Sequence, residues 1–262
     1  MINNLLASGC SFTFGNELSD DNGKTPSEFS WSALLGKKFN LSYTCLAKGG
    51  LGNSGISRKI LKNIDTIKNT IVVVMWTFPS RYDWAMPRSK YLEDTRWATI
   101  TPWDTTYNEK EVLEKIANND HVIKDFKDRR KEYREAGVTD FADALYRYAA
   151  NNYFEIYNSW KEIVFLQNIL EKNKIPFFFT LADNTLFFDK FTPLQENDRL
   201  LSNLYQQINF DRWFFFGERM MGFDQWAHLN DYERATTHPL DLAHHDAVQL
   251  MENKFKQIIE GA

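Results

Sequence analysis

This sequence has few cysteines, no excess of basic residues and no long apolar runs, and each of these features excludes a class of protein. Only two of the 262 residues are cysteines, Cys10 and Cys45, which provide neither a disulfide framework nor the spacing of a zinc site. The 31 lysines and arginines are outnumbered by 35 aspartates and glutamates, so the net charge is −4. A nucleic-acid footprint needs a basic surplus, and we therefore expect no nucleic-acid partner.

The sequence also contains no segment of the kind that enters a membrane. No apolar stretch approaches the roughly 18 residues that a membrane helix needs. Residues 1–7 carry no basic group and only a short apolar stretch before Ser8, which differs from a signal peptide. We therefore expect no membrane partner and no signal peptide, as in a cytoplasmic protein.

What the sequence does contain is an alternation of short apolar runs with longer segments of helical periodicity. The apolar runs predict buried strands at residues 4–8, 42–46, 71–76, 175–181 and 212–216. The helical periodicity predicts helices over residues 29–39, 54–68, 151–172 and 240–259. Strands that alternate with helices predict βαβ units and a parallel sheet, whose sites lie at the carboxyl ends of the strands.

One long segment departs from this alternation. Residues 79–150 are polar, rich in charge and interrupted by tryptophans, and they show no clear strand-helix pattern. We predict that residues 1–262 form a single domain and that residues 79–150 are an insertion over the active edge of the sheet. The insertion is either a cap on the site or solvated decoration.

A serine follows the first predicted strand, in the run Gly-Cys-Ser-Phe-Thr that begins at Gly9. A serine at a tight turn from strand to helix can present its hydroxyl above the sheet. The N–H groups at the start of the helix then face any oxyanion that develops there. On its own, Ser11 is better explained as a helix cap, because Gly-x-Ser also occurs by chance.

Two further motifs stand in a specific order along the chain. A glycine-rich turn, residues 48–55, follows the second strand, and His238-Pro239 precedes the last helix. Together with the Gly-Cys-Ser of residues 9–11, these motifs resemble the blocks of the SGNH (GDSL-like) hydrolases. Gly52-Asn53-Ser54 corresponds to the second block and His238-Pro239 to the last, so the resemblance spans nearly the whole chain.

The resemblance implies a fold and a chemistry. The fold is α/β, a three-layer α/β/α sandwich around a parallel sheet of flavodoxin-like strand order. The chemistry is the hydrolysis of a small-molecule or carbohydrate ester, such as an O-acetyl ester, through an acyl-serine intermediate without a metal or other cofactor. Ser11 is the implied nucleophile, His238 the implied general base, and Gly52 with Asn53 belongs to the implied oxyanion and substrate-binding residues.

The sequence differs from the family in the first and third blocks. Cys10 stands where the family has an aspartate, a position that is mostly structural. The third block lacks the asparagine that completes the family's oxyanion hole, and the chain continues from Trp76 without it. Thr77 or Ser80 can donate a hydrogen bond in its place, and Arg81 can supply positive charge.

The last block also differs, because the family's aspartate three residues before the histidine is replaced by Ala235. Asp231 or Glu233 are candidates to orient His238 instead. Alternatively, Asp241 and His244 form an Asp-x-x-His pair of their own, with His244 as the base.

A metal site formed by His244, His245 and Asp246 is disfavoured, because neighbouring positions on a helix point in different directions.

Two functions from different classes therefore remain open. One is an active serine ester hydrolase. The other is a degenerate SGNH fold that binds a ligand or serves as a structural protein, for example in a viral particle. The viral alternative comes from the resemblance to uncharacterised phage-type members that share the Gly-Cys-Ser-Phe-Thr block, and it makes a virion the second expected location. The substrate's acyl and leaving groups and the oligomeric state are not encoded in these motifs.

Overall fold

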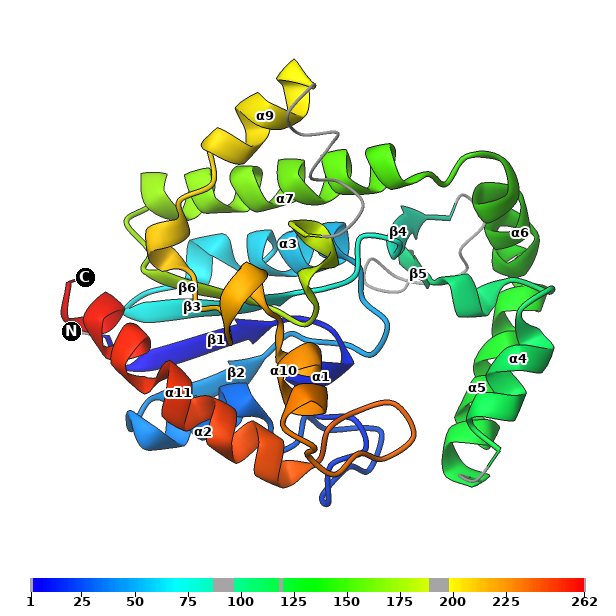
Figure 1. Cartoon of the computed structure of the whole chain (residues 1–262), viewed down its shortest axis with the longest axis horizontal. Coiled ribbons are helices and arrows are strands. Elements are labelled where there is room, and N and C mark those ends of the chain that lie inside the picture. The colour runs from blue at the N-terminus through cyan, green and yellow to red at the C-terminus, as the bar shows by residue number, and fades with distance from the viewer. Residues whose placement is uncertain (1, 87–96, 118–119, 189–197, 262) are drawn as a thin grey trace.

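A parallel sheet forms the centre of the molecule in the computed structural model, which describes residues 2–86, 97–117, 120–188 and 198–261. Its four strands lie in the order β2-β1-β3-β6 (Figure 1). Their bounds are β1 Asn4–Ser8, β2 Ser42–Cys45, β3 Thr70–Trp76 and β6 Phe177–Leu181. Every neighbouring pair is parallel, and the order follows the flavodoxin-like scheme. The predicted α/β fold class is confirmed.

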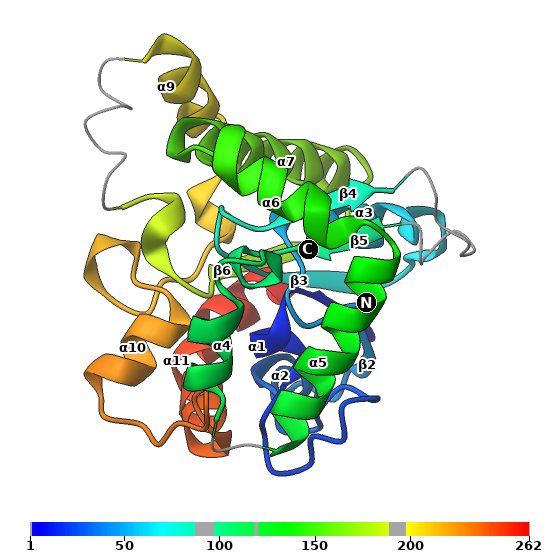
Figure 2. The same cartoon turned by 90° about the vertical axis from the view of Figure 1, so that its right-hand side faces the viewer.

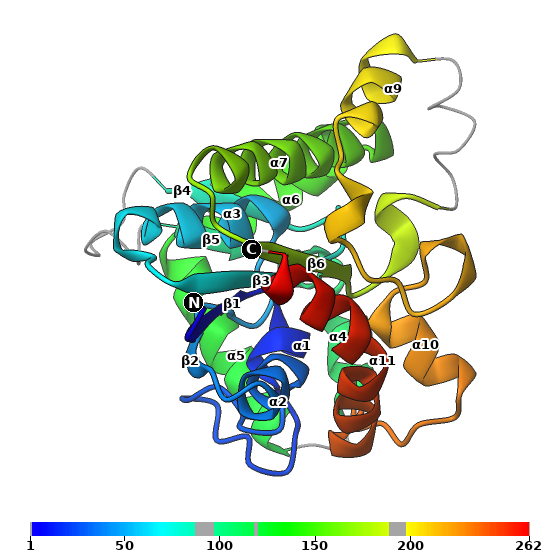
Figure 3. The same cartoon turned by 90° about the vertical axis from the view of Figure 1, so that its left-hand side faces the viewer.

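Helices cover both faces of this sheet, as Figure 3 shows from the end at which the strands begin. One face carries α3 (Asn53–Leu61) and α7 (Asn152–Lys172), and the other carries α2 (Trp31–Lys38) and α11 (Asp241–Glu260). Because side chains alternate across a strand, Val72 and Val74 pack toward the α7 layer, while Ile71 and Val73 pack toward the α11 layer. All seven residues of β3 are buried, which explains its continuous apolar run.

The prediction of a fifth strand at residues 212–216 is wrong, because these residues form no strand. Among the described residues of this segment, only Trp213 forms a parallel bridge, to Phe179 of β6. The Phe214 N–H still donates to the Phe179 carbonyl at 2.9 Å, but the Phe216 N–H donates to Met221 instead. The chain therefore bends away from the sheet after a single pairing. The predicted helix over residues 54–68 is likewise shorter, since α3 ends at Leu61 and is followed only by a 3-10 turn, η1 (Ile64–Thr66).

The described parts of residues 79–150 form a two-stranded sheet and three helices on the side of the central sheet at which its strands end (Figures 1 and 2). The elements in this segment are β4 (Tyr82–Ala85), β5 (Trp97–Ile100), the 3-10 turn η3 (Pro102–Asp104), α4 (Glu109–Lys115), α5 (Asp120–Glu135) and α6 (Val138–Tyr148). β4 and β5 pair antiparallel, and β4 packs against α3. Ile100 and Val138 belong to a small apolar cluster that is separate from the two layers beside the sheet.

The remaining elements are short. They are α1 (Ser11–Phe14), η4 (Asn184–Leu186), α9 (Arg199–Gln206), η5 (Phe210–Arg212), η6 (Glu218–Met220) and α10 (Phe223–Leu229). None of the helices that the structure describes is long and apolar enough to cross a membrane.

Substitution of Gly9 tests how tightly the turn after β1 is packed. A Cβ at Gly9 would lie 2.1 Å from the Thr13 hydroxyl oxygen and 2.7 Å from the Thr13 Cβ, so the backbone must shift to admit it. We expect Gly9→Ala to lower the free energy of unfolding by about 1–3 kcal/mol, the usual cost of overpacking. Urea denaturation followed by circular dichroism measures this change.

Gly36→Ala is the matched control for that substitution. Gly36 lies within α2, and a Cβ there would meet its nearest neighbour, the Tyr43 Cβ, at 3.4 Å, an ordinary contact. Because alanine is the better helix former by about 1 kcal/mol, this change should be neutral or stabilising. Equal losses from both substitutions would contradict the packing described for the turn.

Candidate active site

Ser11 lies at the carboxyl end of β1, as the first residue of α1, and is 7% exposed. The strand ends at Ser8, and Cys10 is the N-cap residue of the short helix. Gly15 ends the helix with a φ of 85°, in the left-handed region that favours glycine. The turn from strand to helix expected from the sequence therefore presents the serine at this edge of the sheet.

His238 meets this serine from the opposite end of the chain. Its Nε2 lies 2.7 Å from the Ser11 Oγ, and its Nδ1 lies 2.7 Å from the Glu17 Oε2. The Phe12 ring packs edge-on against the imidazole at 4.8 Å between centroids. Serine, imidazole and carboxylate thus form one hydrogen-bonded line, the arrangement by which a base activates a hydroxyl nucleophile.

The Glu17 carboxylate is held by several donors besides His238. It accepts hydrogen bonds from the Thr236 N–H at 3.2 Å, from the Thr237 N–H at 2.9 Å and from the Thr237 hydroxyl at 2.8 Å. The side chains of Glu17 and His238 are only 8% and 12% exposed. The carboxylate is therefore fixed in place behind the imidazole.

The environment keeps Glu17 ionised. Burial acts to raise the pKa of Glu17, but the hydrogen bond and charge of His238, with the hydrogen bonds from Thr237, outweigh it and lower the pKa to about 2. An ionised carboxylate at Nδ1 favours the imidazole tautomer with its proton there. Nε2 is then free to accept the Ser11 proton.

Glu17 was not among the carboxylates that the sequence suggested. The expected candidates were Asp231 and Glu233, near the family's aspartate position. Glu17 instead lies six residues after Ser11, in the loop that follows α1, where no family motif marks it. Only the tertiary packing of that loop against the Thr237-His238 turn brings its carboxylate to Nδ1.

The side chains of the alternative pair, Asp241 and His244, are hydrogen-bonded to Ser19 and Trp31. The carboxylate of Asp241 accepts hydrogen bonds from the N–H and the hydroxyl of Ser19, the first at 3.1 Å. His244 is 1% exposed, and its Nδ1 accepts the Trp31 N–H at 3.0 Å. Burial, with the nearby charge of His238, lowers the pKa of His244 to about 3. The geometry therefore contradicts the expectation of His244 as the base, because Ser11 is hydrogen-bonded to His238.

Gly52 also differs from the expectation. Its N–H was expected to face the oxyanion, but it donates to the Asp83 Oδ2 at 3.0 Å, as does the Gly55 N–H, also at 3.0 Å. The Thr99 hydroxyl donates to the other carboxylate oxygen at 2.9 Å. Asp83 stands on β4, whose packing against α3 carries the carboxylate onto the start of that helix. Burial raises the pKa of Asp83, against the hydrogen bond from Thr99 and the charge of Arg58.

The Asn53 side chain is hydrogen-bonded within the protein, and the oxyanion or substrate contact expected of it stays a prediction. Its amide donates to the Thr77 carbonyl at 3.1 Å and to the Ser159 Oγ at 3.0 Å, and its carbonyl accepts the Thr77 N–H at 2.9 Å. These bonds fix the backbone immediately after β3. The Thr77 hydroxyl is buried and has no hydrogen-bond partner among the described residues.

Ser80 and Arg81, the other two residues expected near the oxyanion, follow in the same loop. The Ser80 carbonyl accepts the Tyr146 hydroxyl at 2.6 Å. The Arg81 guanidinium lies over the Phe78 ring, 4.7 Å from its centroid, and its Nη1 is buried without an acceptor in the described part of the chain. A contact of either side chain with substrate stays a prediction.

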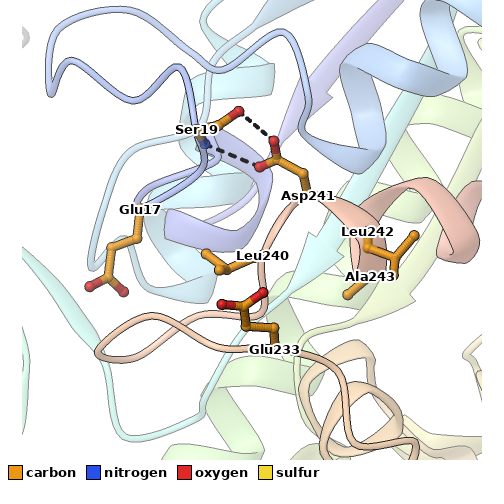
Figure 4. A pocket seen from close by; sticks show the side chains of 7 residues that line it. All are labelled: Glu17, Ser19, Glu233, Leu240, Asp241, Leu242 and Ala243. Atoms are coloured by element: carbon orange, nitrogen blue, oxygen red, sulfur yellow. Dashed lines mark hydrogen bonds between the residues drawn. The ribbon is translucent and has the colours of Figure 1, made fainter.

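A hollow of about 380 Å³ lies on the Glu17 side of the site (Figure 4). The lining residues are Glu17, Ser19, Glu233, Leu240, Asp241, Leu242 and Ala243. Figure 4 shows Asp241 turned toward Ser19 and Glu233 turned toward Leu240. Across the residues that the structure describes, no group of three or more histidine, cysteine, aspartate or glutamate side chains is arranged to hold a metal ion.

Comparison with known proteins gave matches among solved structures only, at low sequence identity. No protein-family model and no curated protein matches the chain. The psychrotrophic esterase EstA from Pseudoalteromonas sp. is 11% identical with a TM-score of 0.47, and the match covers 97% of both chains. A putative lipolytic protein of the G-D-S-L family from Desulfitobacterium hafniense is 12% identical with a TM-score of 0.48, over 96% of this chain and 99% of that one. An acetyl xylan esterase from Butyrivibrio proteoclasticus is 9% identical with a TM-score of 0.43, over 97% and 64%.

The lowered pKa of Glu17 predicts a pH-dependent contribution to stability. The carboxylate stabilises the folded chain fully above its ordinary pKa of 4.5, and this contribution is lost as the pH falls toward the folded-state value of about 2. The wild type should therefore exceed Glu17→Gln in free energy of unfolding above about pH 4.5, and the difference should shrink as the pH is lowered. Urea denaturation of both proteins between about pH 6 and pH 3 measures it. A difference that stays constant over this range would contradict the ion-pair geometry.

Proposed function

We propose that this chain is a serine ester hydrolase of the SGNH type, with Ser11 as nucleophile, His238 as general base and Glu17 as the orienting carboxylate. The observation that carries the proposal is the pair of 2.7 Å contacts that joins Ser11 Oγ to His238 Nε2 and His238 Nδ1 to Glu17 Oε2. The order of the three sequence motifs along the chain supports the same assignment.

The first half of the reaction forms an acyl-serine. Nε2 of His238 takes the hydroxyl proton of Ser11 as Oγ bonds to the acyl carbon of the ester, and the carbonyl oxygen becomes an oxyanion. The tetrahedral intermediate then collapses, the bond to the leaving alkoxide breaks, and the alkoxide takes the proton from Nε2. Glu17 stabilises the imidazolium that exists between these two transfers.

The second half repeats the sequence with water. His238 removes a proton from a water molecule whose oxygen bonds to the acyl carbon, and the intermediate collapses with release of the carboxylic acid. Ser11 Oγ leaves and regains its proton from Nε2. In both halves the N–H of Ser11 is available to the oxyanion, since the first N–H groups of a helix have no acceptor within it.

The proposed substrates are small-molecule or carbohydrate esters, with O-acetyl esters as the first group to test. The alternative, a fold of the same type that binds a ligand without turnover, or a structural component of a viral particle, predicts no hydrolysis that depends on Ser11. Short-chain aryl esters such as 4-nitrophenyl acetate discriminate between the two functions, because they place few demands on the leaving-group site.

Removing the nucleophile and the base should be strongly non-additive. Ser11 and His238 act as one unit, so Ser11→Ala, His238→Ala and the double variant should all lose activity to a similar extent. The expected loss in kcat is on the order of a thousandfold or more. Hydrolysis of 4-nitrophenyl acetate by the three purified variants tests this expectation. His244→Ala is the comparison, and its folded form should hydrolyse the ester. Losses that multiply in the double variant would contradict a shared mechanism.

Replacing the orienting carboxylate should slow turnover and leave the fold intact. Glu17→Gln keeps the size of the side chain but removes the charge that stabilises the His238 imidazolium, and we expect kcat to fall by roughly 10³- to 10⁴-fold. Glu233→Gln is the matched control, because Glu233 lines the same hollow, whereas the hydrogen bonds described for the His238 ring go to Thr237, Glu17 and Ser11. A similar fall in kcat on 4-nitrophenyl acetate from both substitutions would contradict the role assigned to Glu17.

A further inference from the structure

Glu17 reaches His238 from a backbone conformation that residues other than glycine rarely adopt. Its φ is 66°, in the left-handed region of the backbone map. A residue with a Cβ is strained there, and it persists in such a conformation only where the surrounding structure over-determines it. The loop that carries Glu17 must therefore be held in place by contacts beyond the one to His238.

This loop, which follows α1, is attached at two points to the chain at the start of α11. At the first point the Glu17 carboxylate accepts the Thr237 N–H and meets His238 Nδ1. At the second point, two residues further along the loop, the Asp241 carboxylate accepts hydrogen bonds from Ser19 (Figure 4). One carboxylate oxygen takes the Ser19 N–H at 3.1 Å, and the other takes the Ser19 hydroxyl. Asp241 thus uses both of its oxygens to hold the loop.

The two attachments belong to one short turn of the chain. The Glu17 N–H donates to the Asp21 carboxylate at 2.6 Å, and this bond closes the turn around Ser19. On the other side, Asp241 is the first residue of α11 and lies three residues after His238. The hollow of about 380 Å³ is lined by Glu17, Ser19 and Asp241 among others, so hydrogen bonds rather than close packing join the two segments there. The bond between Ser19 and Asp241 therefore sets how the Glu17 turn lies against His238.

We propose that Asp241 is a positioning residue of the catalytic site, which holds Ser19 and thereby keeps Glu17 in the conformation from which its carboxylate reaches His238. This inference rests on the proposed function. The hydrogen bonds described for the Asp241 carboxylate go to Ser19 and not to the reacting groups, so its effect on the reaction is carried through Glu17. A negative charge at the first residue of α11 also stabilises that helix, and the experiment has to separate the two roles.

Asp241→Ala removes both acceptors of the Ser19 donors. We expect kcat on 4-nitrophenyl acetate to fall by about tenfold to a hundredfold, the scale that follows from a misplacement of about 1 Å in an active site. Asp241→Asn keeps one carbonyl oxygen as an acceptor, and its kcat should lie between those of the wild type and Asp241→Ala. Ser19→Ala removes only the hydroxyl donor and should give a smaller loss in the same direction. It remains informative if Asp241→Ala does not fold.

A double-mutant cycle with Glu17→Ala separates positioning from a general loss of stability. If Asp241 acts through Glu17, then Asp241→Ala should have little further effect in a chain that already lacks the Glu17 carboxylate. A purely structural role of Asp241 would give the same fold-loss in both backgrounds. The rate at which a fluorophosphonate labels Ser11 is measured beside kcat, because it can be followed over long times where turnover is slow.

Asp246→Ala is the matched control. Asp246 lies on α11 as well, and its carboxylate accepts the Tyr232 hydroxyl at 2.8 Å, but its described hydrogen bonds go to Tyr232 and His245 and not to the Glu17 loop. This substitution should leave kcat unchanged.

Two results would overturn the role of Asp241 while the hydrolase function stands, provided that the wild type shows hydrolysis that depends on Ser11. One is full kcat in Asp241→Ala and Ser19→Ala. The other is a loss from Asp241→Ala that multiplies with the loss from Glu17→Ala. If the wild type shows no hydrolysis that depends on Ser11, the proposed function fails and the inference fails with it.

Discussion

The hydrogen bond between the Glu17 carboxylate and Nδ1 of His238 is the contact on which the rest of the site depends. It joins the loop after α1 to the turn before α11, two segments separated by 221 residues of sequence. With the carboxylate at Nδ1, the imidazole has one orientation in which Nε2 meets Ser11 at 2.7 Å. The same contact accounts for the lowered pKa of Glu17 despite its burial.

The sheet supplies the geometry around this contact. Gly9 lets the chain turn tightly after β1, and the Asn53 amide holds the backbone after β3 through two hydrogen bonds to Thr77 and is itself tied to the Ser159 hydroxyl of α7. The Asp83 carboxylate, from β4, lies at the start of α3 and accepts a hydrogen bond from the Gly52 N–H. The carboxyl edge therefore contains a serine, an imidazole and a carboxylate in line, and the Gly52 N–H nearby in the motif order is bonded to a carboxylate.

Local patterns were sufficient to predict the frame of the fold and two members of the site. The run at residues 4–8 coincides with β1, and the Gly-Cys-Ser and His-Pro motifs identified the two side chains that meet at 2.7 Å. Glu17 could not be predicted, because its role comes from a loop that packs against a turn from the far end of the chain. The motif around Gly52 predicted that its N–H would face the oxyanion. The structure shows this N–H bonded to Asp83, which belongs to a segment without strand-helix periodicity, so the contact could not be predicted from the local sequence.

The most direct measurement of the central claim is the reaction of the purified chain with a serine-reactive fluorophosphonate, followed by mass mapping of the adduct. An activated serine attacks phosphorus and retains the phosphonyl group, so the reaction reports the nucleophile without any assumption about substrate. The account predicts a single adduct on Ser11 that forms far more slowly in His238→Ala, whose fold can be checked by circular dichroism. No adduct on Ser11, or equal labelling of the wild type and His238→Ala, would contradict it.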